Sequence, residues 1–149
     1  MRNIILHLNL YVIILLLSSF QSQKNETFNL SVEATDLRNS TGTVLFALYI
    51  RDDAFPDEHY TKYLKKIIGK ISNKSSIVTF TNLPQGKYAV SILHDENNNG
   101  KIDKGLIFPV EGIGFSNYKT IGFSNRPTFA KASFLVNRNL KLKTKAIYL

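Results

Sequence analysis

The acidic segment from Asp95 to Asp103 sets oxygen-bearing side chains at alternate positions around Gly100. A calcium ion takes about six to eight oxygen ligands, and a loop supplies them when alternate residues point inward and a glycine at the sixth position permits a sharp bend. In this segment Gly100 is the sixth residue. The candidate ligands are four side chains and, at the seventh position, one backbone carbonyl: Asp95, Asn97, Asn99, Asp103 and the carbonyl of Lys101. We therefore predict a calcium site here.

The segment departs from a complete EF-hand loop at the twelfth position, where Leu106 stands in place of the bidentate glutamate. Glu111 is the nearest carboxylate that could complete the ligand set, by reaching back after Pro109. With it, we expect weak affinity of the extracellular type, with Kd about 10⁻⁴ to 10⁻³ M. The alternative interpretation is a polar turn that binds no metal, because asparagine and glycine are common in turns.

Catalytic motifs are hard to find in this chain, which has no cysteine nucleophile and no G-x-S-x-G elbow. We therefore predict a module that is not an enzyme. A small hydrolase stays open as an alternative, with His94 beside Ser116 and an acid such as Asp103 or Glu111. We expect instead that His94 packs under the acidic segment and hydrogen-bonds a backbone carbonyl.

A second alternative is a carbohydrate-binding or envelope-polymer-binding module. It would use three lysines near the C-terminus together with loop aromatics: Lys141, Lys143 and Lys145, with Phe115, Tyr118 and Phe123. The competing interpretations are that the aromatics close one end of the core and that the lysines keep a strand edge hydrated.

Residues 1–22 resemble a secretory signal peptide, since Arg2 precedes an apolar run from Ile4 to Leu17. The run is shorter than the roughly 20 residues that a bilayer span needs, so we expect cleavage and no transmembrane segment afterwards. The remaining residues, 26–149, are enough for a single domain. We predict a secreted or periplasmic protein whose fold depends on core burial, because it has no cysteine for disulfides.

The formal net charge is +8. A basic protein outside the cytoplasm meets anionic polymers, so an envelope polysaccharide or a protein is the partner class that we expect. Nucleic acid is not expected, because no recognition motif is present. The plainer interpretation of the charge is a well-hydrated surface.

Period-two alternation of apolar residues predicts strands over 28–35, 77–83, 87–94, 130–136 and 140–149. Residues 43–50 are apolar at nearly every position, which predicts a central strand buried on both faces. Residues 107–126 contain Ile-Gly-Phe-Ser-Asn twice, and we interpret them as an irregular loop or a strand pair.

Apolar residues at helical spacing between Tyr60 and Lys70 predict a short amphipathic helix or a loop insertion that covers one end of the core. Leu83-Pro84-Gln85-Gly86 suits a type I turn, which predicts a β-hairpin. Together these elements predict a mainly β fold, an antiparallel seven-stranded β-sandwich of immunoglobulin-like or prealbumin-like type with one short helical insertion.

Three motifs in order carry a family resemblance: residues 83–90 (LPQGKYAV), 94–103 (HDENNNGKID) and 109–117 (PVEGIGFSN). With them, the chain from about Leu30 to the C-terminus resembles the uncharacterised exported bacterial family designated domain of unknown function 2141. The resemblance implies a prealbumin-type or carboxypeptidase-regulatory-type sandwich of no established molecular function. It also implies that seven motif positions lie together at one end of the sandwich: His94, Asp95, Asn97, Asn99, Asp103, Glu111 and Ser116.

These observations lead to one functional hypothesis. The protein is an exported, non-catalytic β-sandwich module in which calcium at the acidic segment orders residues 112–125 as a recognition surface.

Overall fold

The structure is a computed structural model that describes residues 26–107 and 109–149. The predicted signal peptide, residues 1–22, lies outside the described residues. Among the helices that are described, none has the length and apolar character needed to cross a membrane.

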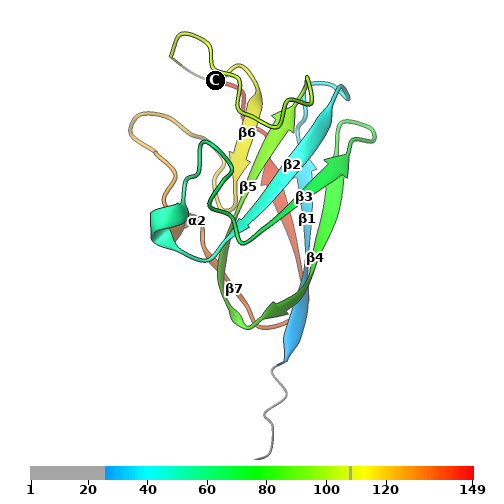
Figure 1. The fold of residues 1–149 in the computed structure, drawn as a ribbon, viewed down its shortest axis with the longest axis vertical. Coiled ribbons are helices and arrows are strands. Elements are labelled where there is room, and N and C mark those ends of the chain that lie inside the picture. The colour runs from blue at the N-terminus through cyan, green and yellow to red at the C-terminus, as the bar shows by residue number, and fades with distance from the viewer. Residues whose placement is uncertain (1–25, 108) are drawn as a thin grey trace, which may run out of the picture.

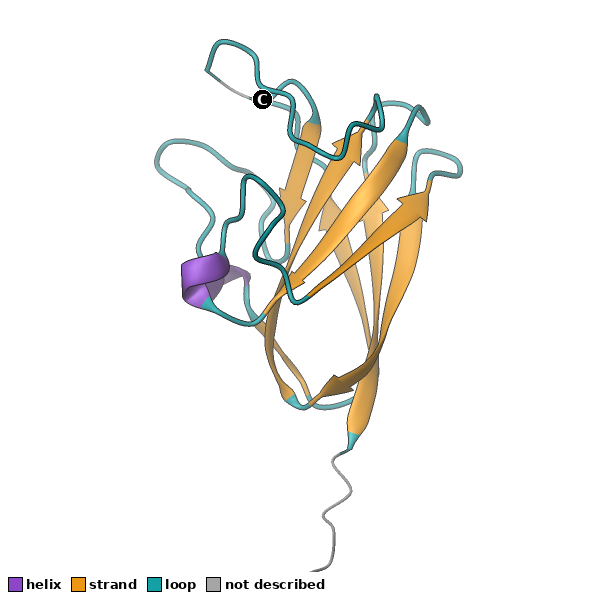
Figure 2. Cartoon of the chain, in the orientation of Figure 1, coloured by secondary structure: helices purple, strands orange, loops and turns teal. Residues whose placement is uncertain are grey.

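The described residues form eight strands in two sheets (Figure 1). The three-stranded sheet has the order β4-β1-β8, with bounds β1 Thr27–Thr35, β4 Ser76–Pro84 and β8 Leu140–Lys145. The five-stranded sheet contains β3 Lys65–Lys70, β2 Thr43–Tyr49, β5 Gly86–Asp95 and β6 Gly112–Phe115 in that order, and β7 Phe134–Val136 also pairs with β5. The short helix α2, Phe129–Ala132, and a 3-10 turn, Asp52–Ala54, lie to one side of the strands (Figure 2).

The mainly β prediction is confirmed, and five of the predicted strands correspond to β1, β2, β4, β5 and β8, although β8 ends at Lys145 and the predicted strand extends to residue 149. Two details differ from the prediction. The described chain has eight strands where the sequence indicates about seven, and the arrangement is not wholly antiparallel. β8 runs parallel to β1, with Leu30 opposite Leu140, whereas the other strand pairs are antiparallel.

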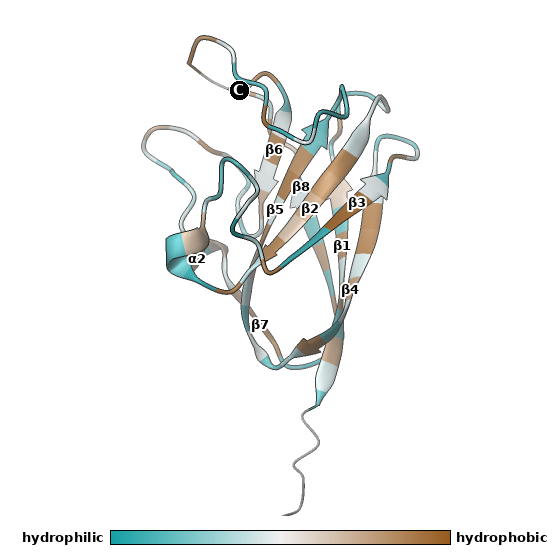
Figure 3. Ribbon diagram, viewed as in Figure 1, coloured by the Kyte–Doolittle hydropathy of each residue, from teal (hydrophilic) through white to brown (hydrophobic). Residues whose placement is uncertain are grey.

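Strand β2 of the five-stranded sheet is buried on both faces, as the apolar composition of residues 43–50 predicts. Successive side chains of a strand point to opposite faces, so β2 contributes alternately to two cores. Val44, Phe46 and Leu48 pack between the sheets against β1 and β4 residues such as Leu30 and Phe80. Their neighbours on the outer face belong to a second cluster, with Leu45, Ala47, Tyr49, Phe55, Tyr60, Phe115 and Tyr118. Figure 3 shows hydrophobic colouring along much of β2.

The predicted helix between Tyr60 and Lys70 is wrong, because residues 65–70 form the edge strand β3 beside β2. Ile67 lies opposite Phe46 and packs against the inner core, while Ile68 faces outward and is 62% exposed. The pattern Lys-Lys-Ile-Ile is too short to separate a strand from a helix by its period, and β-branched residues favour the strand. The segment forms a strand because it pairs with the free hydrogen-bonding edge of β2.

The predicted hairpin at residues 83–86 is also wrong. β4 pairs with β1, whereas β5 pairs with β2, so the turn carries the chain from one sheet to the other. Leu83 and Tyr88 are both buried in the core between the sheets. The Tyr88 hydroxyl donates to the Pro84 carbonyl at 2.8 Å and fixes this crossing.

The strand predicted over residues 130–136 forms only in its second half, as β7, because residues 129–132 form α2. The Thr128 side chain caps this helical turn by accepting from the Lys131 amide. The Ala132 side chain is fully buried in the outer cluster.

Candidate functional site

The acidic loop joins β5 to β6, two neighbouring antiparallel strands in which His94 lies opposite Gly112. It lies at the same end of the molecule as the C-terminus (Figure 1). Because the two strands are paired, Asp95 at the end of β5 and Glu111 just before β6 must lie close together. The fold therefore brings the two ends of the acidic segment to one place.

The Asp95 carboxylate closes the first half of the loop. It accepts the backbone N–H of Asn99 at 3.0 Å and of Gly100 at 2.7 Å. Gly100 has a φ of +71°, a left-handed conformation that favours glycine. The Asn97 and Asn99 side-chain oxygens each accept the amide two residues further on, at 3.0 and 2.8 Å. Side chains of the loop therefore fix its conformation by accepting hydrogen bonds from its own backbone amides, among them the amide of Lys101.

Asp103 and Glu111 close the second half. The Asn97 Nδ2 donates to Asp103 Oδ2 at 2.6 Å, and the Asn99 Nδ2 donates to Asp103 Oδ1 at 2.9 Å. Glu111 is 3% exposed and folds back under the loop. Its two carboxylate oxygens accept the amides of Glu96 and Asp103 at 2.9 and 3.1 Å. The five predicted side-chain ligands are therefore joined by one hydrogen-bond network.

This network concentrates negative charge. Burial raises the pKa of Glu111, and the nearby charges of Asp103 and Asp95 raise it further, against the two amides that stabilise the ionised form. Within residues 26–107 and 109–149, no basic side chain forms an ion pair with these three carboxylates, and Lys104 pairs with Glu58 at 2.5 Å instead. In the described chain, no three side chains of histidine, cysteine, aspartate or glutamate lie close enough together to hold a metal ion by themselves. A cation at this loop therefore also needs amide and carbonyl oxygens.

His94 precedes the acidic loop at the end of β5, and its side chain is fully buried. Its Nε2 lies 2.9 Å from the Thr41 carbonyl and its Nδ1 lies 2.6 Å from the Tyr148 hydroxyl. A carbonyl only accepts, so Nε2 carries the proton and Nδ1 accepts from the hydroxyl. The predicted bond to a backbone carbonyl is confirmed, and it ties β5 to the turn before β2 and to the C-terminal segment.

Glu96, the second residue of the loop, points away from its centre. It accepts from Arg38 Nε at 2.9 Å and from Asn39 Nδ2 at 2.6 Å. The hydrogen bond from Arg38 is the main reason why the pKa of Glu96 lies below its ordinary value. Alternation along the loop predicts this outward direction, although sequence reasoning did not identify the arginine partner.

Ser116 does not join the acidic loop, contrary to what the family resemblance implies. Its hydroxyl accepts from the Val90 amide at 2.9 Å and donates to the Ala132 carbonyl at 2.8 Å. Val90 precedes Asp95 by five strand residues, a separation of roughly 16 Å along β5. The hydrolase alternative needs Ser116 beside His94, and the hydrogen bonds of the two side chains go to different partners.

The loop aromatics and the C-terminal lysines do not form one surface. Phe115 and Tyr118 are 8% and 5% exposed and pack in the outer cluster, whereas Phe123 is 72% exposed. Lys143 and Lys145 lie on the other sheet, where each pairs with a carboxylate at 3.2 Å. The structure thus agrees with the interpretation of Phe115 and Tyr118 as packing residues.

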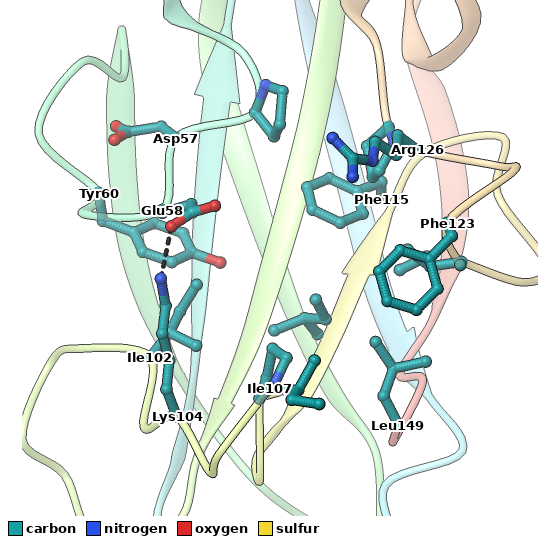
Figure 4. Close-up of a pocket in the computed structure, with 16 residues that line it drawn as sticks. Asp57, Glu58, Tyr60, Ile102, Lys104, Ile107, Phe115, Phe123, Arg126 and Leu149 are labelled. Atoms are coloured by element: carbon teal, nitrogen blue, oxygen red, sulfur yellow. Dashed lines mark hydrogen bonds and ion pairs between the residues drawn. The ribbon is translucent and has the colours of Figure 1, made fainter.

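A pocket of about 550 Å³ adjoins the acidic loop on the outer face of the five-stranded sheet (Figure 4). Its apolar walls come from four distant parts of the chain, and six of the residues are Tyr60, Ile102, Ile113, Phe115, Phe123 and Leu149. Four charged residues also line it: Asp57, Glu58, Lys104 and Arg126. Sequence reasoning missed this pocket, because no single segment contains enough of it to give a pattern.

Asp57 builds one wall of the pocket. Its buried carboxylate accepts the amides of His59, Thr61 and Lys62 at 3.2, 2.7 and 2.6 Å. Between them Tyr60 takes a φ of +51°, which is strained for a bulky residue, and its buried side chain lies in the outer cluster. Burial raises the pKa of the Tyr60 hydroxyl. An aspartate directly after Pro56 is a turn signal that could have located this segment.

The fold and the site define a mainly β protein of two sheets, with an acidic loop and an apolar pocket side by side at one end. The chain belongs to the family of uncharacterised proteins conserved in bacteria, DUF2141, which matches residues 32–143. Neither the comparison with curated proteins nor the comparison with solved structures gave a match. The family resemblance in the sequence is thereby confirmed, and the family assigns no activity.

Proposed function

We propose that this protein is a non-catalytic β-sandwich module that acts outside the cytoplasm, and that its acidic loop binds calcium. The observation that carries the proposal is the network of Asp95, Asp103 and Glu111, with no ion-pair partner for these carboxylates in the described chain. Burial is the main reason for the raised pKa of Glu111, and a divalent cation would neutralise the charges of Asp95 and Asp103 that raise it further. The signal-like N-terminus supports a place outside the cytoplasm.

Oxygen atoms for such a cation are available from every alternate position of the loop. The residues that would hold it are the predicted set of Asp95, Asn97, Asn99, the Lys101 carbonyl and Asp103, with Glu111 beneath. Asn97 and Asn99 turn their amide nitrogens toward Asp103 and their oxygens toward the backbone N–H groups of Asn99 and Lys101. Each side chain would therefore give up that backbone hydrogen bond when it turns its oxygen toward a cation. Hard carboxylate, amide and carbonyl oxygens are the ligands that calcium prefers.

Calcium would also order the neighbouring recognition surface, residues 112–125. Glu111 is bonded to the loop through Glu96 and Asp103, and Gly112 follows it as the first residue of β6. The Val110 amide donates to the Asp103 carbonyl at 2.9 Å and closes the base of the loop. Fixing the loop therefore fixes the entry into β6 and the segment after it.

The test is thermal and urea unfolding of the protein in 10 mM calcium chloride and in chelator, with isothermal titration for the affinity. A ligand selective for the folded state stabilises it, and Kd values of 10⁻⁴ to 10⁻³ M correspond to about 1.4 to 2.7 kcal/mol at this concentration. Asp103→Asn should remove the shift, because it deletes one charge from the network. Asp53→Asn, in the exposed 3-10 turn, is the matched control and should keep it. Identical unfolding of the wild type with and without calcium overturns the proposal.

A further inference from the structure

The pocket beside the acidic loop has an apolar interior and one cationic group that the fold leaves unused. Of its charged residues, Glu58 and Lys104 pair with one another at 2.5 Å. The Asp57 carboxylate is occupied by three backbone amides and points away from Phe115 and Phe123 in Figure 4. The remaining charge is that of Arg126, which lies near Phe115 in the same view.

The backbone at Arg126 is held firmly in place. The buried Tyr118 hydroxyl donates to the Arg126 carbonyl at 3.1 Å and accepts from the Thr128 amide at 3.0 Å. Within the ranges that the structure describes, the Arg126 guanidinium has neither a hydrogen bond nor an ion pair. Arg126 is exposed, and a guanidinium at the mouth of an apolar pocket can bind a carboxylate or phosphate with two parallel hydrogen bonds.

The opposite wall of the pocket is a segment whose backbone conformation is fixed by hydrogen bonds. Tyr60 keeps its left-handed backbone because the Asp57 carboxylate holds the amides on both sides of it. Strain of this kind costs about 1 to 3 kcal/mol, and it persists where the surroundings enforce it, most often at binding sites. The volume of about 550 Å³ lies in the range of small-molecule pockets.

We propose that this pocket binds an amphipathic anion, a small molecule with an apolar chain or ring system and one carboxylate, sulfonate or phosphate group that pairs with Arg126. The proposal deepens the recognition role of residues 112–125, since Ile113, Phe115 and Phe123 line the pocket. It rests on that part of the proposed function and not on calcium. The experiments are therefore made in chelator, so that failure of calcium binding leaves their outcome unchanged.

The first experiment measures binding of the fluorescent sulfonate 1-anilinonaphthalene-8-sulfonate to the protein and its displacement by decanoate or decan-1-ol. The two competitors share an apolar chain and differ in charge. Decanoate should displace the probe at an about tenfold lower concentration, because only it forms a charge-assisted bond with Arg126. Absence of saturable probe binding, or equal displacement by both competitors, overturns the proposal.

Variants then locate the site. Arg126→Met should weaken decanoate about five- to tenfold and leave decan-1-ol unchanged. Arg138→Met removes an exposed cation that does not line the pocket and should change neither. Phe123→Ser, at a side chain 72% exposed, should weaken both competitors without unfolding the protein. Equal losses in Arg126→Met and Arg138→Met would assign the effect to net charge and reject the pocket.

Discussion

The repeated pentapeptide Ile-Gly-Phe-Ser-Asn offers an internal comparison, because the same substitution can be made in both copies. In the first copy, a Cβ on Gly114 would lie 2.2 Å from the Lys145 carbonyl oxygen and 2.9 Å from the Ile92 side chain. In the second copy, a Cβ on Gly122 meets nothing within 4 Å. We therefore expect Gly114→Ala to destabilise the fold strongly and Gly122→Ala to be nearly neutral.

The magnitude follows from what must move. Relief of the 2.2 Å contact requires β6 and the end of β8 to separate by about 1 Å. The same two segments are joined by two backbone hydrogen bonds between Ile113 and Ile147, of 3.0 and 2.8 Å. Overpacking costs about 1 to 3 kcal/mol and each lost hydrogen bond about 1 kcal/mol, so the loss is about 3 to 5 kcal/mol. Gly122→Ala should stay within about 0.5 kcal/mol of the wild type.

Urea unfolding measures the difference, with tyrosine fluorescence and far-UV circular dichroism as probes because the chain has seven tyrosines and no tryptophan. The comparison is valid if the slope of free energy against urea is the same for the three proteins. Equal unfolding midpoints for the two variants would refute the close contact at Gly114. So would a larger loss for Gly122→Ala.

Three further outcomes are expected. The Thr144 Oγ1 is buried without a hydrogen-bond partner in the described chain, so Thr144→Val should raise the unfolding free energy by about 1 kcal/mol in urea. The lowered pKa of Glu96 stabilises the fold above about pH 4.5, and this contribution is lost as the pH falls through the lowered value. The difference between wild type and Arg38→Met, about 1 kcal/mol or less near pH 7, should therefore shrink near pH 3, and a constant difference would contradict the pairing. His94→Phe removes the two hydrogen bonds of a fully buried side chain, to the Thr41 carbonyl and the Tyr148 hydroxyl, and should cost about 1 to 3 kcal/mol by the same assay, whereas a neutral result would contradict these bonds.

A strand was predictable from the sequence where its own residues show which of its faces are buried. Residues 43–50 have no polar face, and the structure covers both faces of β2. The same reasoning fails where a pattern is too short to separate the two periods, as in Lys-Lys-Ile-Ile, which forms a strand because it pairs with the free edge of β2. It fails again at residues 83–86, because the turn residues are compatible with a return to the same sheet and with a crossing to the other one.

The acidic loop was predictable because its side chains act on amides only a few residues away, as Asp95 does on Gly100. The partners of its supporting residues are distant in sequence, and the Tyr148 contact of His94 spans 54 positions. The pocket could not be predicted from local sequence patterns, because its lining residues Tyr60, Phe115 and Arg126 come together only in the folded protein. The two copies of Ile-Gly-Phe-Ser-Asn make the same point, because one copy is a strand and the other a loop.

The parallel pairing of β8 with β1 has a consequence for the order in which the protein can mature. The first strand finds one neighbour in β4, but its other edge stays open until residues about 110 positions later become available. Contacts of such long sequence separation slow folding, and an open edge invites association with other chains. A nascent or C-terminally shortened chain therefore exposes β1, so this protein should acquire its native state only after synthesis is complete.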